Sequence, residues 1–206
     1  MVDTLGPGIP ALASKLKEAF PKFTFGILNF GQGSTDLQSG WYRLTNSTTY
    51  LGIYVPPVLS YKPDILVIES FGYNHWSANQ YDLDRQWLTF AHIVDTVRKE
   101  SPDTKIVMAS TIGPNPYTYG DGKLNWPKGL KWESAQTTKI YLQNAINFAD
   151  SQHIPIANAY HPSLDGNGHG RPVYINQGDH LHPSDAGKAL FADKIVDAIV
   201  TNNLIQ

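Results

Sequence analysis

The chain of 206 residues contains no cysteine. This absence excludes disulfide bonds, thiolate nucleophiles and zinc sites that are built on thiolates. It leaves the localisation of the protein open, because a chain without thiols does not report the redox state of its compartment.

Long hydrophobic runs and a strong net charge are also absent. No apolar stretch approaches the ~20 residues that a transmembrane helix needs, and residues 1–10 lack the basic start and apolar centre of a signal peptide. The net charge of −2 gives no electrostatic reason for binding nucleic acid or an anionic membrane surface. We therefore expect no nucleic-acid partner and no transmembrane segment.

The composition is typical of one globular domain over residues 1–206. Hydrophobic residues make up 41% of the chain and charged residues 17%, which is the balance of a folded domain rather than of a disordered chain. Aromatic residues make up 12%. Many of them lie in predicted loops, which suggests a binding surface that is both apolar and able to form hydrogen bonds.

Helical segments alternate with short apolar runs along the chain. Segments with apolar residues at helical spacing are expected to be helices: residues 9–20, 83–100, 134–151 and 184–202. Apolar runs that are bounded by turn residues are expected to be buried strands: residues 23–29, 64–70, 105–110 and 153–157. The alternation predicts a layered α/β fold with a parallel sheet and right-handed crossovers.

The other segments are expected to be less regular. Residues 47–59 are predicted to form a helix that is broken at two prolines, and residues 31–40 a flexible loop rich in glycine. Residues 111–133 and 160–177 are predicted to be long loops. Loops of this length are uncommon in compact domains and often functional.

Asp179 and His182 lie three residues apart, directly before the last predicted helix. At this spacing the carboxylate can accept a hydrogen bond from one imidazole nitrogen and leave the other free to take a proton from a nucleophile. That is the base and its orienting partner in a hydrolytic triad. Pro183 and Ser184, a natural helix N-cap, would hold the histidine backbone in front of a rigid element. The alternative is a polar turn that caps the helix, with His180 and His182 merely exposed.

Two further polar turns directly follow predicted strands. Asn74 ends the sequence Gly-Tyr-Asn, and its side-chain amide could donate to an oxyanion, an interaction worth about 3–4 kcal/mol in comparable sites. Gly31 and Gly33 follow another strand, and glycine lets a backbone N–H point into a site without a Cβ in the way. Neither stretch matches a phosphate-binding motif. Taken alone, each is also an ordinary turn.

Taken together and in this order, the glycine-rich turn, Gly-x-Asn and Asp-x-x-His-Pro resemble the SGNH (GDSL-like) hydrolase superfamily. The resemblance runs over nearly the whole chain and implies a three-layer, flavodoxin-like α/β fold with a parallel sheet. It implies ester hydrolysis through an acyl-serine intermediate, with no cofactor. It further implies that His182 is the general base and Asp179 its orienting partner. Asn74 and Gly33 would stabilise the oxyanion, with Gly31 as the alternative to Gly33.

The chain departs from the family pattern in two places. His75 stands where family members usually carry an aspartate after Gly-x-Asn. The nucleophile of the family lies in a Gly-Asp-Ser at the end of the first strand, and this sequence contains no Gly-Asp-Ser. Residues 1–6 resemble the segment that follows that motif, so we expect the serine and the first, central strand to lie upstream of Met1. Without that strand, residues 23–29 and 64–70 would lack a shared neighbour and leave backbone groups unpaired.

Two alternatives concern the nucleophile itself. Ser34 and Ser70 lie at the same expected edge of the sheet and are the candidates within the chain, although neither sits in a Gly-x-Ser-x-Gly elbow. A chain without a nucleophile could also serve as a non-catalytic domain that binds carbohydrate or lipid.

A metal-dependent hydrolase is a third alternative. Asp179, His180 and His182 offer ligands in one short stretch, and His161 or His169 could complete the set.

The expected substrate is a small-molecule, carbohydrate or lipid ester. Trp76, Tyr117 and Trp126 are candidates for binding it, since aromatic side chains in loops can shape an acyl or sugar subsite. The sequence leaves the acyl chain, the alcohol and the oligomeric state open.

Overall fold

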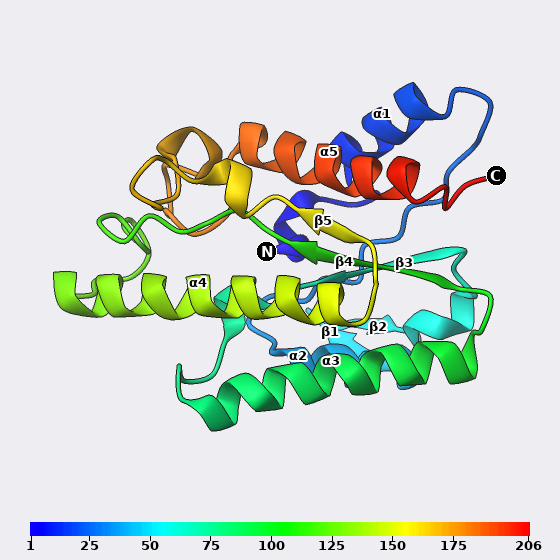
Figure 1. The fold of residues 1–206 in the computed structure, drawn as a ribbon, viewed down its shortest axis with the longest axis horizontal. Helices are drawn as coiled ribbons and strands as arrows, with labels where there is room; N and C mark the ends of the chain where they lie inside the picture. Colours follow the sequence, from blue (N-terminus) through cyan, green and yellow to red (C-terminus); the bar gives the residue numbers. More distant parts are fainter.

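A parallel sheet lies at the centre of the structure, a computed structural model that describes residues 1–206 (Figure 1). Its strands are β3 (Ile65–Glu69), β4 (Lys105–Ser110) and β5 (Ile156–Asn158), in the order β3-β4-β5. Ile65 pairs with Lys105, and Met108 pairs with Ile156. These are three of the four apolar runs in the sequence, and burial on both faces is what such runs favour in a parallel sheet.

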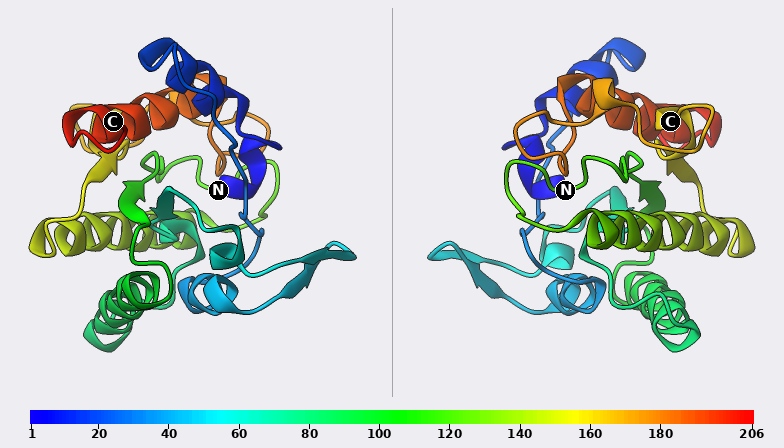
Figure 2. Two further views of the ribbon diagram at one scale, coloured as in Figure 1. Left: turned by 90° about the vertical axis from the view of Figure 1, so that its right-hand side faces the viewer. Right: turned by 90° about the vertical axis from the view of Figure 1, so that its left-hand side faces the viewer.

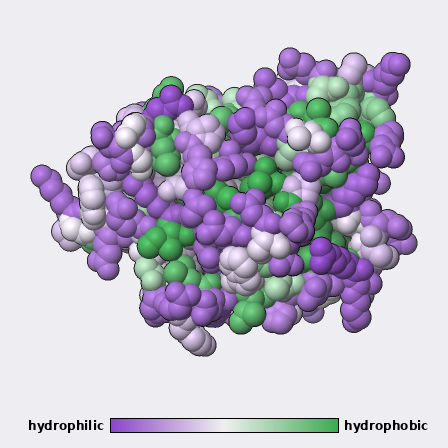
Figure 3. Space-filling view, viewed as in Figure 1, coloured by the Kyte–Doolittle hydropathy of each residue, from purple (hydrophilic) through white to green (hydrophobic).

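Helices cover both faces of this sheet and make the fold three layers thick (Figures 1 and 2). One face is covered by α1 (Pro10–Ala19) and α5 (Asp185–Thr201). The other face is covered by α2 (Leu37–Thr45), α3 (Gln80–Glu100) and α4 (Lys128–Ser151). The α/β fold with a parallel sheet is therefore confirmed. The face shown in Figure 3 is mainly hydrophilic, with hydrophobic residues visible in places. No helix is long and apolar enough to span a bilayer.

Each face of the sheet has its own hydrophobic core. The side under α1 and α5 contains Leu12, Leu16, Phe191 and Ile195, whereas the side toward α2, α3 and α4 contains a larger cluster centred on buried aromatic and branched residues. Short 3-10 turns connect the main elements: η1 (Val2–Leu5), η2 (Val58–Tyr61), η3 (Gly72–Asn74), η4 (His161–Ser163) and η5 (Pro172–Tyr174).

The helix predicted at residues 47–59 is wrong. Thr48–Tyr50 (β1) and Ile53–Val55 (β2) form an antiparallel hairpin that projects from the body of the molecule (Figure 2). Leu51 and Gly52 at its tip both have positive φ, 50° and 78°, which is the backbone of a type I′ hairpin turn. β-branched and aromatic residues on both sides of that turn favour extended strands over a helix.

Other boundaries also differ from the prediction. The loop expected over residues 31–40 runs directly into α2, whose N-cap Asp36 accepts a hydrogen bond from the Ser39 amide. Helix α4 begins at Lys128 rather than at residue 134, so Trp132 lies in a helix and not in a loop. Strand β5 begins at Ile156 rather than at residue 153.

Residues 23–29, predicted to be a strand, form no ladder. From Thr24 to Phe30 no backbone group forms a hydrogen bond with another backbone group, and β3 pairs with β4 only. A cavity of about 840 Å³ is lined by this segment and by β3, with side chains from both cores. The apolar run therefore lacks a neighbouring strand, and a strand cannot form without a partner for its backbone groups.

Candidate active site

His182 and Asp179 form the pair that their spacing predicts. The Nδ1 atom of His182 lies 2.9 Å from Oδ2 of Asp179. The other carboxylate oxygen, Oδ1, accepts hydrogen bonds from the backbone amides of Leu181 at 2.9 Å and His182 at 3.0 Å. The Nε2 atom of His182 forms no hydrogen bond within the protein. One ring nitrogen is thus held by the carboxylate, and the other is free.

The surroundings of Asp179 favour its charged form. Partial burial by itself raises the pKa of the Asp179 carboxyl, but hydrogen bonds from the two amides and from the His182 ring outweigh it and lower the pKa. An ionised carboxylate at this position can stabilise a positively charged imidazole, which is the role of the acid in a Ser-His-Asp triad.

The histidine loop is tied down on both sides. The amide of Asn176 donates to the His182 carbonyl at 2.8 Å, and Ile175 bridges to Pro183. Ser184 caps α5 by accepting from the Gly187 amide at 3.1 Å, as predicted. These contacts fix the backbone of His182 directly before a long helix.

His180 faces a different partner from His182. Its Nδ1 atom lies 3.1 Å from the Asp121 carbonyl, and its own carbonyl accepts from the Gly120 amide at 3.4 Å. A Cβ on Gly122 would collide with the Gly178 carbonyl. His180 therefore joins the loop after β4 to the histidine loop, and only His182 is paired with Asp179.

Asn74 ends the short η3 turn that follows β3, and its side-chain amide forms no hydrogen bond within the protein. The turn starts from Phe71, whose φ of 53° is left-handed and strained for a bulky residue. Oε2 of Glu69 accepts a hydrogen bond from the backbone amide of Phe71 at 2.8 Å. The Phe71 carbonyl accepts one from the backbone amide of Asn74 at 3.0 Å. Glu69 is buried, which raises the pKa of its carboxyl.

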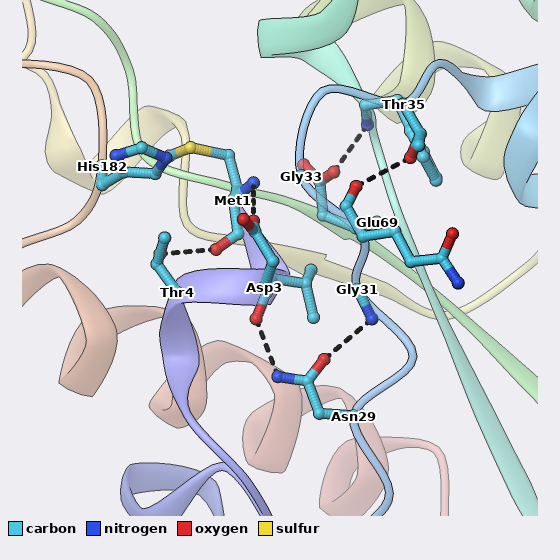
Figure 4. A network of polar contacts seen from close by, with 12 residues as sticks. Met1, Asp3, Thr4, Asn29, Gly31, Gly33, Thr35, Glu69 and His182 are labelled. Carbon is cyan, nitrogen blue, oxygen red and sulfur yellow. Dashed lines mark hydrogen bonds and ion pairs between the residues drawn. The ribbon is translucent and has the colours of Figure 1, made fainter. Parts of the chain in front are cut away.

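The two candidate backbone donors already have partners. The Gly33 amide donates to the Tyr50 hydroxyl at 2.9 Å, and the Gly31 amide donates to Oδ1 of Asn29 at 2.9 Å. The Asn29 side chain in turn donates to the Val2 carbonyl at 2.8 Å (Figure 4). The glycine-rich turn is therefore an ordered part of the site rather than a flexible loop.

The first residues of the chain lie between the histidine and this turn (Figure 4). The side chain of Met1 extends toward His182, and its backbone ammonium group bonds Oδ1 of Asp3 at 3.0 Å. A Cβ on Gly33 would lie 2.7 Å from Oδ2 of Asp3. The N-terminal turn thus lies between two of the predicted motifs, the histidine loop and the glycine-rich turn.

Neither serine that was considered as an internal nucleophile contacts His182. Ser70 is fully buried, and its hydroxyl donates to Oε1 of Glu69 at 2.6 Å. Ser34 is exposed, has a left-handed φ of 59°, and its hydroxyl forms no hydrogen bond. Within the 206 residues, no serine hydroxyl is hydrogen-bonded to the free nitrogen of the histidine.

The three aromatic candidates lie in different surroundings. Trp76 packs against the core on the α3 side, with the Arg85 guanidinium 3.9 Å above its ring. Trp126 stacks on Tyr119 with ring centroids 6.2 Å apart. Only Tyr117 is highly exposed, at 66%.

Tyr117 belongs to a group of three rings, of which Tyr117 and Trp132 are exposed and His169 is half-buried. The Tyr117 ring lies 5.6 Å from that of Trp132 and 5.2 Å from that of His169. The three residues come from the loop after β4, the first turns of α4 and the loop after β5, so they share the carboxyl edge of the sheet.

The residues of the proposed metal site are dispersed. His161 forms hydrogen bonds with Asn158 and Gln143, whereas the ring of His169 packs against those of Tyr117 and Trp132. No three His, Asp or Glu side chains are arranged to hold a metal ion.

Sequence reasoning did not identify Tyr50, Glu69 or Phe71 as parts of this site. The sequence did contain a signal for Glu69, since a single carboxylate in an otherwise apolar strand needs an explanation. Tyr50 had none, because its contact with the glycine-rich turn joins segments 17 residues apart and was hidden by the wrong helix prediction.

The model of the GDSL-like Lipase/Acylhydrolase family matches residues 6–190. A search of curated proteins finds no significant match.

Several solved structures have a similar fold. A GDSL-like lipase from Bacteroides thetaiotaomicron is 17% identical, with a TM-score of 0.63 over 93% of this chain and 84% of its own. An acetyl xylan esterase is 16% identical, with a TM-score of 0.63 over 94% and 90%. A catalytic mutant of an acetylxylan esterase from Geobacillus stearothermophilus is 16% identical, with a TM-score of 0.63 over 94% and 81%.

Proposed function

The chain belongs to the GDSL-like Lipase/Acylhydrolase family, and from this premise we propose that its site hydrolyses esters through an acyl-serine intermediate. The observation that carries the proposal is the His182–Asp179 pair, with Nδ1 held at 2.9 Å and Nε2 free. The free side-chain amide of Asn74 follows β3 at the carboxyl edge of the same sheet, where sites of open α/β folds form. The family supports ester hydrolysis in general, and the roles of single residues are our inference.

Each proposed step has a residue that is suited to it. His182 takes the proton from the serine hydroxyl through Nε2 while the serine oxygen bonds to the ester carbonyl carbon. Asp179 stabilises the imidazolium that forms. Asn74 and the Gly33 region stabilise the negative carbonyl oxygen, where one donor is worth about 3–4 kcal/mol.

Collapse of this intermediate breaks the carbon–oxygen bond to the alcohol, and His182 returns the proton to the leaving oxygen. Water then attacks the acyl-serine by the same sequence, releases the carboxylic acid and restores the serine. The low pKa of Asp179 suits this cycle, because the carboxylate stays charged throughout.

We place the nucleophile on an extended segment that fills the cavity beside β3. The cavity runs along the whole of β3, from Asp64 at one end to Glu69, Asn74 and Met1 at the other. Its walls include the unpaired edge of β3 and the extended residues 23–30. Buried backbone groups without partners are costly, by about 1–3 kcal/mol each, and a parallel strand in this cavity would satisfy both walls.

The direction of such a strand supports the same position for the serine. A strand parallel to β3 would end beside Met1, the residue whose side chain extends toward His182 (Figure 4). Apolar side chains of this strand would contact Leu12 and Ile195 on one face of the sheet and Ile93 on the other. A serine at its end would come close to the free Nε2 atom.

For the alcohol portion of the ester we propose a carbohydrate. Two solved structures of similar fold are of acetyl xylan esterases, and Tyr117 and Trp132 are exposed at 66% and 43% on the same edge as the site. Exposed aromatic rings with polar atoms at their tips suit a sugar, which also presents apolar and polar faces.

The test compares two forms of the protein on a chromogenic acetyl ester. One is the 206-residue chain, and the other is extended by the in-frame codons that precede Met1 in the gene. We expect hydrolysis only by the extended form, and its loss in His182→Ala. Equal activity of both forms would place the nucleophile within the chain. Inactivity of both would contradict ester hydrolysis and favour a non-catalytic domain.

A further inference from the structure

The amide of Gly33 is not free to meet a substrate in the folded chain. Its N–H donates to the hydroxyl oxygen of Tyr50 at 2.9 Å, and a Cβ on residue 33 would lie 3.0 Å from that oxygen. A backbone N–H has a single hydrogen to donate. A carbonyl oxygen could therefore receive this hydrogen only if Tyr50 withdrew.

The Tyr50 hydroxyl has a hydrogen of its own with no acceptor in the protein. Its contact with Gly33 is the hydroxyl's only hydrogen bond, and there it is the acceptor. A phenolic hydroxyl can accept and donate at the same time. An N–H bonded to the oxygen polarises the O–H group, and successive hydrogen bonds of this kind strengthen one another. The result is a neutral hydroxyl donor beside the glycine-rich turn.

The hairpin holds this hydroxyl in place. Tyr50 ends β1 and pairs with Ile53 of β2. Thr48, two residues earlier and so on the same face of the strand, accepts a hydrogen bond from Nε2 of Gln32 at 2.9 Å. Two adjacent residues of the turn, Gln32 and Gly33, are thus bound by two side chains from one face of the hairpin. Tyr50 is half-buried, whereas Tyr54 on β2 is 66% exposed.

We propose that Tyr50 is a catalytic residue whose hydroxyl donates to the oxyanion in place of the bare Gly33 amide. The inference rests on the ester hydrolysis proposed above and changes the composition of its oxyanion site. The donors become the Asn74 side chain and the Tyr50 hydroxyl. The Gly33 N–H acts through the tyrosine by orienting and polarising its O–H group.

Tyr50→Phe tests this role in the extended, active form. The variant keeps the ring and the hairpin but removes the donor, so kcat should fall by about 10-fold or more with little change in KM, as for loss of a group that acts in the transition state. Tyr54→Phe is the matched control, since it removes a hydroxyl from an exposed position on the same hairpin, and it should leave kcat unchanged. A rise in kcat of Tyr50→Phe would show that the hydroxyl blocks the amide, and an unchanged kcat would show that it takes no part; both would overturn the proposal.

A binding experiment on the 206-residue chain needs no activity. Acetate carries the negative oxygen that an oxyanion site binds, and NMR can follow the Gly33 amide and the Asn74 side-chain amide during a titration. We expect acetate to shift both signals in the wild type and in Tyr54→Phe, and to bind several-fold more weakly to Tyr50→Phe. Equal affinity in the three proteins, or no response to acetate in any of them, would overturn the role of Tyr50. If the extended wild type failed to hydrolyse esters, the proposed function would fail while this titration still tested Tyr50.

Discussion

The ring of Phe71 lies 2.7 Å from the point where a Cβ on Gly40 would be. Gly40 lies within helix α2, where glycine normally costs about 1 kcal/mol relative to alanine. The aromatic ring takes the space that a side chain would need. Phe71 is also the left-handed residue from which the η3 turn with Asn74 starts, so helix α2 supports the position of the proposed oxyanion donor.

Gly40→Ala is therefore expected to destabilise the protein although alanine is the better helix former. We expect a loss of about 1–3 kcal/mol in the free energy of unfolding, as for other overpacked positions, measured by urea denaturation. Gly129→Ala is the matched control, because a Cβ at that helical position in α4 meets nothing within 4 Å. The control should be neutral or more stable than the wild type. A Gly40→Ala protein as stable as the control would contradict this account of Phe71.

The buried carboxyl of Glu69 should make the free energy of unfolding fall as pH rises. Burial raises the pKa of its carboxyl above the ordinary 4.5. The neutral form is favoured in the folded state, so this contribution is complete below pH 4.5 and is lost as pH rises through the folded pKa. Glu69→Gln mimics the neutral form and should remove that loss, which urea denaturation at pH values from 4 to 8 would measure.

Two substitutions at Glu69 distinguish the effect of its charge from the effect of the hydrogen bond that it accepts from the Phe71 amide. Glutamine keeps an acceptor for this amide, whereas Glu69→Leu leaves the half-buried N–H unpaired, at a cost of about 1–3 kcal/mol. We expect the leucine variant to be the less stable of the two at every pH. The reverse order would show that the contact with Phe71 contributes nothing to folding.

Asp179 should give the opposite pH dependence, with a contribution to the free energy of unfolding that is lost as pH falls. Burial raises the pKa of its carboxyl, but amide and imidazole hydrogen bonds lower it below the ordinary 3.8. The charged form is favoured in the folded state, so this contribution is present above pH 3.8 and is lost as pH falls through the lower folded pKa. Asp179→Asn should cost stability near pH 6 and cost progressively less below pH 4. Asp103→Asn, at an exposed residue without a hydrogen bond, is the control, and an equal pH dependence in both would contradict the prediction.

Alanine substitutions at Gly122 and Gly52 together test the contact between the loop after β4 and the histidine loop. Both glycines have positive φ, 85° and 78°, so alanine strains the backbone at either position. Only at Gly122 would a Cβ also collide with the Gly178 carbonyl, directly before Asp179; at Gly52 it meets nothing. We expect Gly122→Ala to be the more destabilising and, in the extended active form, the only one of the two to lower kcat. Urea denaturation and the ester assay measure these effects, and equal behaviour of the two variants would show that the loop contact does not hold His182 in place.

The sequence by itself determined the features that depend on short stretches of chain. Strand β4 was predicted residue for residue because its apolar run is continuous and bounded by turn residues. The pairing of Asp179 with His182 was predictable because only three residues separate them and local backbone geometry brings them together. Ser184 was identified as the N-cap of α5 for the same reason.

Tertiary structure decided the features that need a distant partner. Residues 23–29 have the composition of a buried strand, yet they form no ladder, because strand pairing depends on a neighbour that an apolar run cannot supply for itself. The hairpin at residues 48–55 was missed, since weak β preferences become decisive only when two segments pair. The bond from Gly33 to Tyr50 and the contact of Gly40 with Phe71 likewise join residues 17 and 31 positions apart. Such contacts follow from the packing of whole elements, so the state of the oxyanion site could be described only from the folded chain.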